Sequence, residues 1–191
     1  MRIISGFLKG KKIDFLKSAT TRPLRDFVKE SFFNIIKHSS QIDTSILNSN
    51  VLDLYSGIGS FGIECVSRGA KKITFVENDS KALSVLKKNI LQLKIDKKCN
   101  VFETKIISFL NRLRKDDKYE IIFLDPPFSE NFFIKELEII KSSHIYNKNH
   151  VIIIHRQNNC DEDLSKIINI TMIKKYGRSK IIFGNFKSDT V

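Results

Sequence analysis

From residue 51 onward, short apolar runs alternate with longer segments in which apolar residues recur every three or four positions. The short runs predict β-strands at Val51–Leu54, Lys72–Val76, Asn100–Phe102, Glu120–Leu124 and Val151–Ile154. The segments between them predict helices, one ending near Arg68 and others at Ser80–Leu93, Ile107–Arg114 and Phe132–Lys141. Strands that alternate with helices indicate a mostly parallel sheet covered on both faces.

The two ends of the chain break this alternation. Thr171–Lys175 and Ile181–Phe186 flank a turn at Tyr176–Ser179, which predicts a closing antiparallel hairpin. At the other end, Arg2–Phe7 and Lys12–Leu16 flank a short turn and predict a small β-hairpin.

A helix is predicted to follow this N-terminal hairpin. Its start is marked by Thr20, Thr21 and Pro23, with Thr as the candidate N-cap and Pro in the first turn. Apolar residues then recur at helical spacing and leave Arg25, Lys29 and Asn34 near the opposite, polar face. We therefore expect an N-terminal hairpin and helix over residues 1–40, separate from an α/β domain over residues 50–187.

A glycine-rich turn follows the first strand of the α/β domain. Gly57 and Gly59 remove side chains where the backbone must bend and approach a ligand. Glu77 ends the next strand about 20 residues further on, where an acid accepts hydrogen bonds from ribose hydroxyls in Rossmann-like folds. The spacing with Gly62 also permits a dinucleotide dehydrogenase. Asp53 favours a methyltransferase instead, because its carboxylate stands where it would meet a cationic amino-acid group.

The strongest motif is Asp125-Pro126-Pro127-Phe128 at the end of the fourth strand. Two prolines remove two backbone donors and fix φ at both positions, so the Asp125 carboxylate and the Asp125 and Pro126 carbonyls are held as acceptors. Phe128 adds a flat apolar face. This set is complementary to an exocyclic amino group on a base, which offers two N–H donors and a face that stacks on aromatics. Catalysis there would come from positioning and fixed dipoles.

Charge and composition indicate which class of partner the protein binds. The chain of 191 residues has a net charge of +12, and half of it lies in residues 1–37, where nine Lys and Arg stand against three acids. This asymmetry suggests a polyanion such as nucleic acid. No apolar run is long enough to span a bilayer and no signal peptide is visible, so we expect a cytoplasmic location. Cys65, Cys99 and Cys160 are widely spaced and predict free thiols, with no zinc site.

Four segments together resemble the RsmD-type 16S ribosomal RNA guanine-N2 methyltransferases along nearly the whole chain. They are MRIISGFLKGKKI, TRPLRDFVKESFFNII, VLDLYSGIGSFGIECVSRGAKKITFVEND and IIFLDPPF. The resemblance implies a Rossmann-like class I S-adenosylmethionine methyltransferase with a mostly parallel seven-stranded sheet. It further implies ribosomal RNA as partner, within the small subunit or its assembly intermediate, with no metal and no membrane, in a monomeric protein.

The resemblance also assigns site residues. The cofactor, S-adenosylmethionine, would be held by Asp53, Tyr55, Ser56, Gly57, Gly59, Glu77, Asn78, Lys105 and Ile106. The target guanine would be held by Asp125, Pro126, Pro127 and Phe128. RNA would be met by Arg2, Lys11, Thr21, Arg22, Arg25 and Lys29. Lys105 departs from the Asp or Asn usual near its position, so adenine recognition is expected to use backbone groups at Lys105 and Ile106.

These residues are also compatible with two other functions. An adenine-N6 DNA methyltransferase would use the same Asp-Pro-Pro-Phe chemistry, although 191 residues leave little room for a DNA-recognition region. A catalytically silent ribosome-assembly factor would keep the fold but has no need of Glu77 or the motif. His155, at the end of the fifth strand, is a candidate base or structural residue, and Arg178 in the closing hairpin is a candidate phosphate contact.

Overall fold

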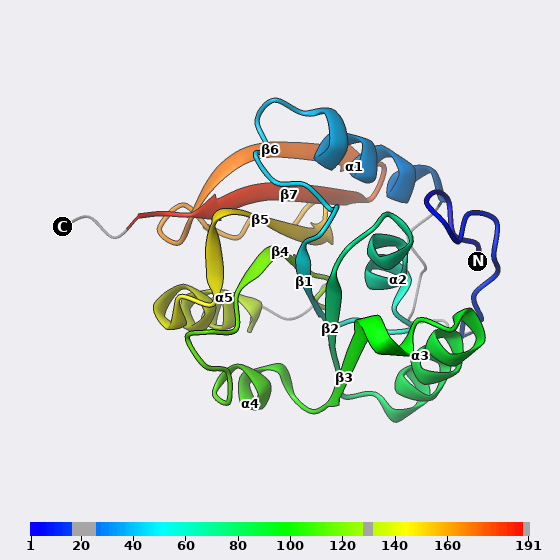
Figure 1. The fold of residues 1–191 in the computed structure, drawn as a ribbon. Coiled ribbons are helices and arrows are strands. Elements are labelled where there is room, and N and C mark those ends of the chain that lie inside the picture. Colours follow the sequence, from blue (N-terminus) through cyan, green and yellow to red (C-terminus); the bar gives the residue numbers. More distant parts are fainter. Residues whose placement is uncertain (17–25, 128–131, 189–191) are drawn as a thin grey trace.

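A seven-stranded sheet forms the centre of the molecule (Figure 1). The computed structural model describes residues 1–16, 26–127 and 132–188. The strands are β1 (Asn50–Leu54), β2 (Lys72–Glu77), β3 (Cys99–Glu103), β4 (Tyr119–Leu124), β5 (Tyr146–Gln157), β6 (Ile168–Tyr176) and β7 (Ser179–Phe186). Their order across the sheet is β3-β2-β1-β4-β5-β7-β6.

Strands β1 to β5 run parallel, whereas β7 pairs antiparallel with both β5 and β6. The predicted α/β fold, a mostly parallel sheet closed by a C-terminal hairpin, is therefore confirmed. Within the sheet, the chain passes from β1 outward through β2 to β3 and then returns to β4, on the other side of β1. The carboxyl ends of β1 and β4 thus form the topological switch point, where open α/β sheets bind their ligands.

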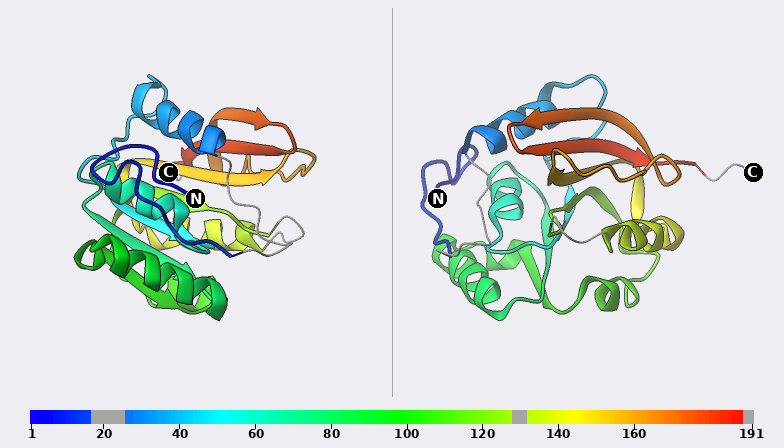
Figure 2. Two further views of the ribbon diagram at one scale, coloured as in Figure 1. Left: turned by 90° about the vertical axis from the view of Figure 1, so that its right-hand side faces the viewer. Right: turned by 180° about the vertical axis from the view of Figure 1, so that it is seen from behind.

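Helices cover both faces of the sheet (Figure 2). They are α1 (Asp26–His38), α2 (Ser60–Ser67), α3 (Ser80–Leu93), α4 (Ile106–Leu110) and α5 (Phe133–Ser143). One hydrophobic cluster joins α1, α2, α3 and the N-terminal segment to one face, and a second joins α4 and α5 to the other. On the first face the rings of Phe61 and Phe123 stack with centroids 4.0 Å apart, so α2 packs directly on β4.

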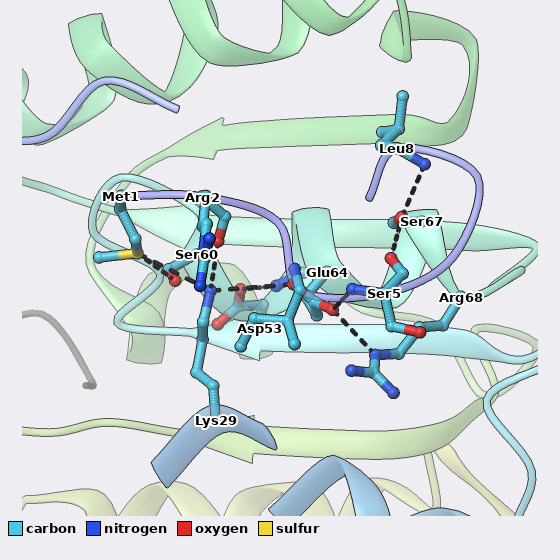
Figure 3. A network of polar contacts seen from close by, with 12 residues as sticks. Met1, Arg2, Ser5, Leu8, Lys29, Asp53, Ser60, Glu64, Ser67 and Arg68 are labelled. Atoms are coloured by element: carbon cyan, nitrogen blue, oxygen red, sulfur yellow. Dashed lines mark hydrogen bonds and ion pairs between the residues drawn. The ribbon is translucent and has the colours of Figure 1, made fainter. Parts of the chain in front are cut away.

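The predicted N-terminal hairpin is present in a short form: Arg2 and Lys12 form an antiparallel bridge, and backbone hydrogen bonds join Ile3 to Gly10 and Lys11 and Met1 to Ile13. Other backbone donors of this segment bind side chains of α2. Ile4 and Ser5 donate to the carboxylate of Glu64, each over 2.9 Å, and Leu8 donates to the hydroxyl of Ser67 over 3.0 Å (Figure 3). The segment therefore lies along α2 and shares its hydrophobic core.

Candidate active site at the carboxyl edge of the sheet

The end of β4 lies directly beside the end of β1. Leu54 and Leu124 are register partners, and the amide of Asp125 donates to the carbonyl of Leu54 over 3.4 Å. The glycine turn and the Asp-Pro-Pro segment, 70 residues apart in sequence, therefore leave the sheet as neighbours. The topology brings together the two motifs that the sequence singled out.

The turn after β1 is built from left-handed backbone. Tyr55, Gly57 and Gly59 have φ angles of +58°, +53° and +83°. A Cβ at Gly59 would lie 2.3 Å from a methyl of Leu86, which would have to move, and the left-handed φ itself favours glycine here. A Cβ at Gly57 would meet nothing within 4 Å, which leaves this backbone open on its outer side.

Glu77 holds the glycine turn against the end of β2. One carboxylate oxygen accepts from the amide of Gly57 over 2.7 Å. The other accepts from the amides of Asn78 and Asp79, each over 2.8 Å. Asn78 itself is exposed. The carboxylate is thus fixed at the mouth of the turn, half-buried, with lone pairs left for further donors.

Asp53 is buried in the last part of β1, with 1% of its surface exposed. Its Oδ2 accepts from the amide of Gly62 over 3.0 Å, whereas Oδ1 is buried and accepts from no described residue. Burial raises the pKa of this carboxyl well above its usual value; the Gly62 hydrogen bond opposes that shift, and the charges of Asp125 and Glu77 add to it. The hydroxyl of Ser56 is buried without a hydrogen-bond partner among described residues as well.

The carboxylate of Asp125 faces β5. Its Oδ1 lies 2.8 Å from Nδ1 of His155, a residue buried in β5, and the carboxyl side chain keeps 36% of its surface exposed. The carbonyls of Pro126 and Pro127 accept from one guanidinium nitrogen of Arg156, over 3.5 Å and 2.9 Å. Phe128 lies outside the described residues.

Arg156 is completely buried, and its charge is matched by Glu162 at 2.5 Å. Its guanidinium also lies over the ring of Phe133 in α5, 4.8 Å from the centroid. Sequence analysis assigned Arg156 no role, because it lies two residues beyond the predicted strand Val151–Ile154 and no partner for it was recognisable. Its burial is a property of the fold, and a buried arginine requires an acid.

The remaining predicted cofactor residues lie on neighbouring elements. The hydroxyl of Tyr55 donates to the buried carboxylate of Glu136 in α5 over 2.8 Å. Lys105 is exposed and is the N-cap residue of α4, and Ile106, the first residue of that helix, is buried. β3 ends beside β2, with Glu77 and Glu103 in register. Lys105 and Ile106 therefore follow at the same edge as the glycine turn.

The predicted RNA residues divide into three groups. Arg2 and Lys11 are exposed. Thr21, Arg22 and Arg25 lie outside the described residues. The expectation that Lys29 lies on the exposed face of the helix is wrong: its side chain is 1% exposed, 3.8 Å from the carboxylate of Glu64, and donates to the carbonyl of Arg2 (Figure 3). Lys29 is buried because it pairs with Glu64 on α2. Helical periodicity within α1 cannot predict a partner on another helix.

The residues at this edge fit S-adenosylmethionine. The cofactor carries an ammonium and a sulfonium cation, and the carboxylates of Glu77 and Asp125 lie near enough to Asp53 for their charges to act on it. The buried Oδ1 of Asp53 can accept a hydrogen bond from a ligand, since no described residue donates to it. Gly57 has open space where a side chain would be, so a ligand can approach the backbone there. In the described part of the chain, no three His, Cys, Asp or Glu side chains gather to hold a metal ion.

Fold and site together define a class I S-adenosylmethionine-dependent methyltransferase. The family described as Conserved hypothetical protein 95 matches residues 1–185, and the chain belongs to that family. Ribosomal RNA small subunit methyltransferase D of Haemophilus influenzae is 32% identical over 176 residues, covering 92% of this chain and 87% of the relative.

Two solved structures extend the similarity to three dimensions. The structure of yhhF from Escherichia coli has a TM-score of 0.83 at 24% identity and covers 99% of both chains. A crystal structure from Haemophilus influenzae has a TM-score of 0.75 at 26% identity, with 97% of this chain and 98% of that chain covered. No helix in the described ranges is long and apolar enough to cross a membrane.

Proposed function

We propose that this protein transfers a methyl group from S-adenosylmethionine to the exocyclic N2 of a guanine in 16S ribosomal RNA. One observation carries the proposal: the Asp125 carboxylate and the prolyl carbonyls leave β4 directly beside the glycine turn of β1. An acceptor set for an amino group thus stands next to a site suited to a cationic methyl donor. The relatives named for small-subunit ribosomal RNA supply the class of substrate.

On the cofactor side, we assign the amino-acid ammonium to Asp53 and the ribose hydroxyls to Glu77. Tyr55, Ser56, Gly57 and Gly59 would form the floor beneath the cofactor. Asn78, Lys105 and Ile106 are assigned to the adenine. When bound, S-adenosylmethionine supplies an electrophilic methyl group on its sulfonium.

On the substrate side, the amine is a weak nucleophile because its lone pair is delocalised into the guanine ring. Asp125 and the carbonyl of Pro126 would each accept one N–H, which favours a more pyramidal nitrogen with its lone pair directed at the methyl. Phe128 would stack on the base. The Asp125 carboxylate and the Pro126 carbonyl would be held in place before the substrate arrives, so they would stabilise the developing positive charge without reorganising.

The proposed substrate is the small ribosomal subunit or its assembly intermediate. The protein is proposed to bind it as a monomer, in the cytoplasm. The N-terminal part, residues 1–40, is proposed to face the RNA, and residues 50–187 to carry the chemistry.

The decisive experiment offers purified small subunits, naked 16S RNA and duplex DNA to the protein with labelled S-adenosylmethionine, followed by mass mapping of the product. Methylation of one guanine at N2 in ribosomal RNA is expected, whereas transfer to adenine in DNA would refute the proposal. Asp125→Ala should abolish transfer and leave cofactor binding within about twofold, because it removes a group that acts mainly in the transition state. Asp125→Asn should be milder, since an amide oxygen still accepts one N–H.

A further inference from the structure

Two consecutive residues of β5 hold the two halves of the Asp-Pro-Pro segment from opposite faces of the sheet. His155 pairs in register with Ile181, which belongs to the cluster under α1 and α2. Arg156 points to the other face, over Phe133 of α5. Successive side chains of a strand alternate between faces, so one strand reaches around both sides of its neighbour's end.

On the first face the contact is to the carboxylate. Nδ1 of His155 lies 2.8 Å from Oδ1 of Asp125, and the imidazole is only 11% exposed. A carboxylate is acceptor-only, so this hydrogen bond requires the proton on Nδ1. The bond occupies Oδ1 and sets the rotation of the carboxyl plane, which leaves Oδ2 as the oxygen directed to a substrate.

On the second face the contact is to the backbone. The guanidinium of Arg156 reaches the carbonyls of both Pro126 and Pro127, and Glu162 holds it from behind, with one carboxylate oxygen 2.6 Å from Nε. A carbonyl oxygen has two lone pairs, so Pro126 can still accept from an amine. The prolines fix φ but not ψ, and the arginine supplies the remaining restraint.

We infer that His155 and Arg156 are positioning residues for methyl transfer: His155 orients the Asp125 carboxylate and Arg156 fixes the prolyl carbonyls, so that both acceptors converge on one amino group. The inference rests on the proposed function for its substrate. It adds residues that the Asp-Pro-Pro-Phe motif does not contain and assigns them separate atoms of the acceptor set.

The test compares two nearly isosteric replacements, His155→Asn and His155→Leu. The amide nitrogen of Asn stands where Nδ1 of His stands, whereas Leu places a methyl there. With small subunits as substrate, His155→Leu should lower kcat by about 10–100-fold, the scale expected when a reacting group is misplaced. His155→Asn should retain most of kcat, and the Kd for S-adenosylmethionine should change less than about twofold in both.

Arg156→Lys should also lower kcat, because a lysine keeps the charge but cannot bind Glu162 with some nitrogens and the two prolyl carbonyls with another, as the planar guanidinium does. Thermal unfolding and cofactor binding verify that each variant folds. Full activity of His155→Leu, or equal losses in the Asn and Leu variants, would overturn the orienting role of His155.

A second readout does not depend on activity. Nitrogen-detected NMR of the histidine side chains should show His155 with its proton on Nδ1 in the wild type, and that preference should weaken in Asp125→Ala. A proton on Nε2 alone would overturn the pairing even in a fully active enzyme. Conversely, a wild type that shows the Nδ1 proton but methylates no ribosomal RNA would refute the proposed function and leave the pairing intact.

Discussion

At the scale of single residues, Asp53 has the most unfavourable position in the site. Its carboxyl is buried, only one oxygen has a hydrogen-bond donor among the described residues, and burial raises its pKa well above the usual value. Such a group is expensive to ionise, and retaining it is explained by a cationic ligand that would lower the cost. The site and the stability of the chain therefore make opposite demands on this position.

Asp53→Asn should separate those demands. A carboxyl whose folded pKa lies above its unfolded pKa contributes stability that is present below the unfolded value and lost as pH rises through the folded value. At pH 7.5 the variant should therefore be more stable than wild type, because wild type must ionise a buried carboxyl whose pKa is raised by burial. The difference should vanish near pH 4, and urea unfolding at both pH values measures it.

The same variant should bind S-adenosylmethionine more weakly, because it lacks the carboxylate that we assign to the ammonium. Calorimetric titration of the two proteins provides the comparison. A variant that is less stable at pH 7.5 than at pH 4 relative to wild type would contradict the account of Asp53.

At the scale of elements, α2 connects the N-terminal segment and α1 to the sheet through one buried carboxylate. Glu64 accepts from the amides of Ile4 and Ser5 and from the guanidinium of Arg68 over 3.0 Å, and it lies 3.8 Å from the ammonium of Lys29 (Figure 3). Removing it would leave the buried ammonium of Lys29 without its opposite charge and the amides of Ile4 and Ser5 without their acceptor. The helix thus anchors the N-terminal segment, through Ile4 and Ser5, and α1, through Lys29.

Glu64→Ala should cost about 3–5 kcal/mol of unfolding free energy, the usual penalty for a buried charge that loses its partner. The matched control is Glu103→Ala, which breaks an ion pair with Lys87 whose side chains are 53% and 56% exposed. The control should cost less than about 1 kcal/mol. Similar losses in both variants, measured by chemical denaturation, would show that the N-terminal segment is not anchored through Glu64.

The elements also show where prediction from sequence succeeds. Helix α3 was predicted with its observed bounds because its ends are set locally: Asp79 accepts from the amide of Ala82 over 2.7 Å, and Lys94 ends the helix in a left-handed conformation. The alternation of strands and helices likewise specified the sheet. The residues that determine these helix ends and strands lie within or next to each element, so they can be read from the local sequence.

The failures have a non-local cause. The burial of Lys29 depends on Glu64, about 35 residues further along the chain, and the contacts of the N-terminal segment with α2 depend on Glu64 and Ser67, about 60 residues away. In the site, the glycine turn and the Asp-Pro-Pro segment were visible because glycine and proline carry their own backbone rules. Arg156 was not, since its meaning depends on the carbonyls it reaches in three dimensions.

At the scale of the whole molecule, exposed cations lie on both sides of the proposed active site. Arg2 follows Met1, whose sulfur accepts from the hydroxyl of Ser60 at the start of α2, over 3.0 Å. Arg178 lies in the turn between β6 and β7, which is tied to the end of β5 by a 2.8 Å bond from the amide of Asn158. The N-terminal segment at Arg2 and the β6–β7 turn at Arg178 therefore lie on either side of the end of β4, from which Asp125 emerges.

An RNA strand that delivers a guanine to Asp125 would therefore pass both arginines. Each phosphate contact releases about one counterion, so Arg2→Ala and Arg178→Ala should each weaken RNA binding and reduce the slope of log K against log salt by about one unit. Lys97→Ala is the matched control, because this exposed lysine precedes β3 at the opposite edge of the sheet and should leave the slope unchanged. Filter binding across a salt series would measure all three. Equal slopes for the two arginine variants and wild type would place the RNA path elsewhere. A reduced slope in only one variant would assign the path to that side of Asp125.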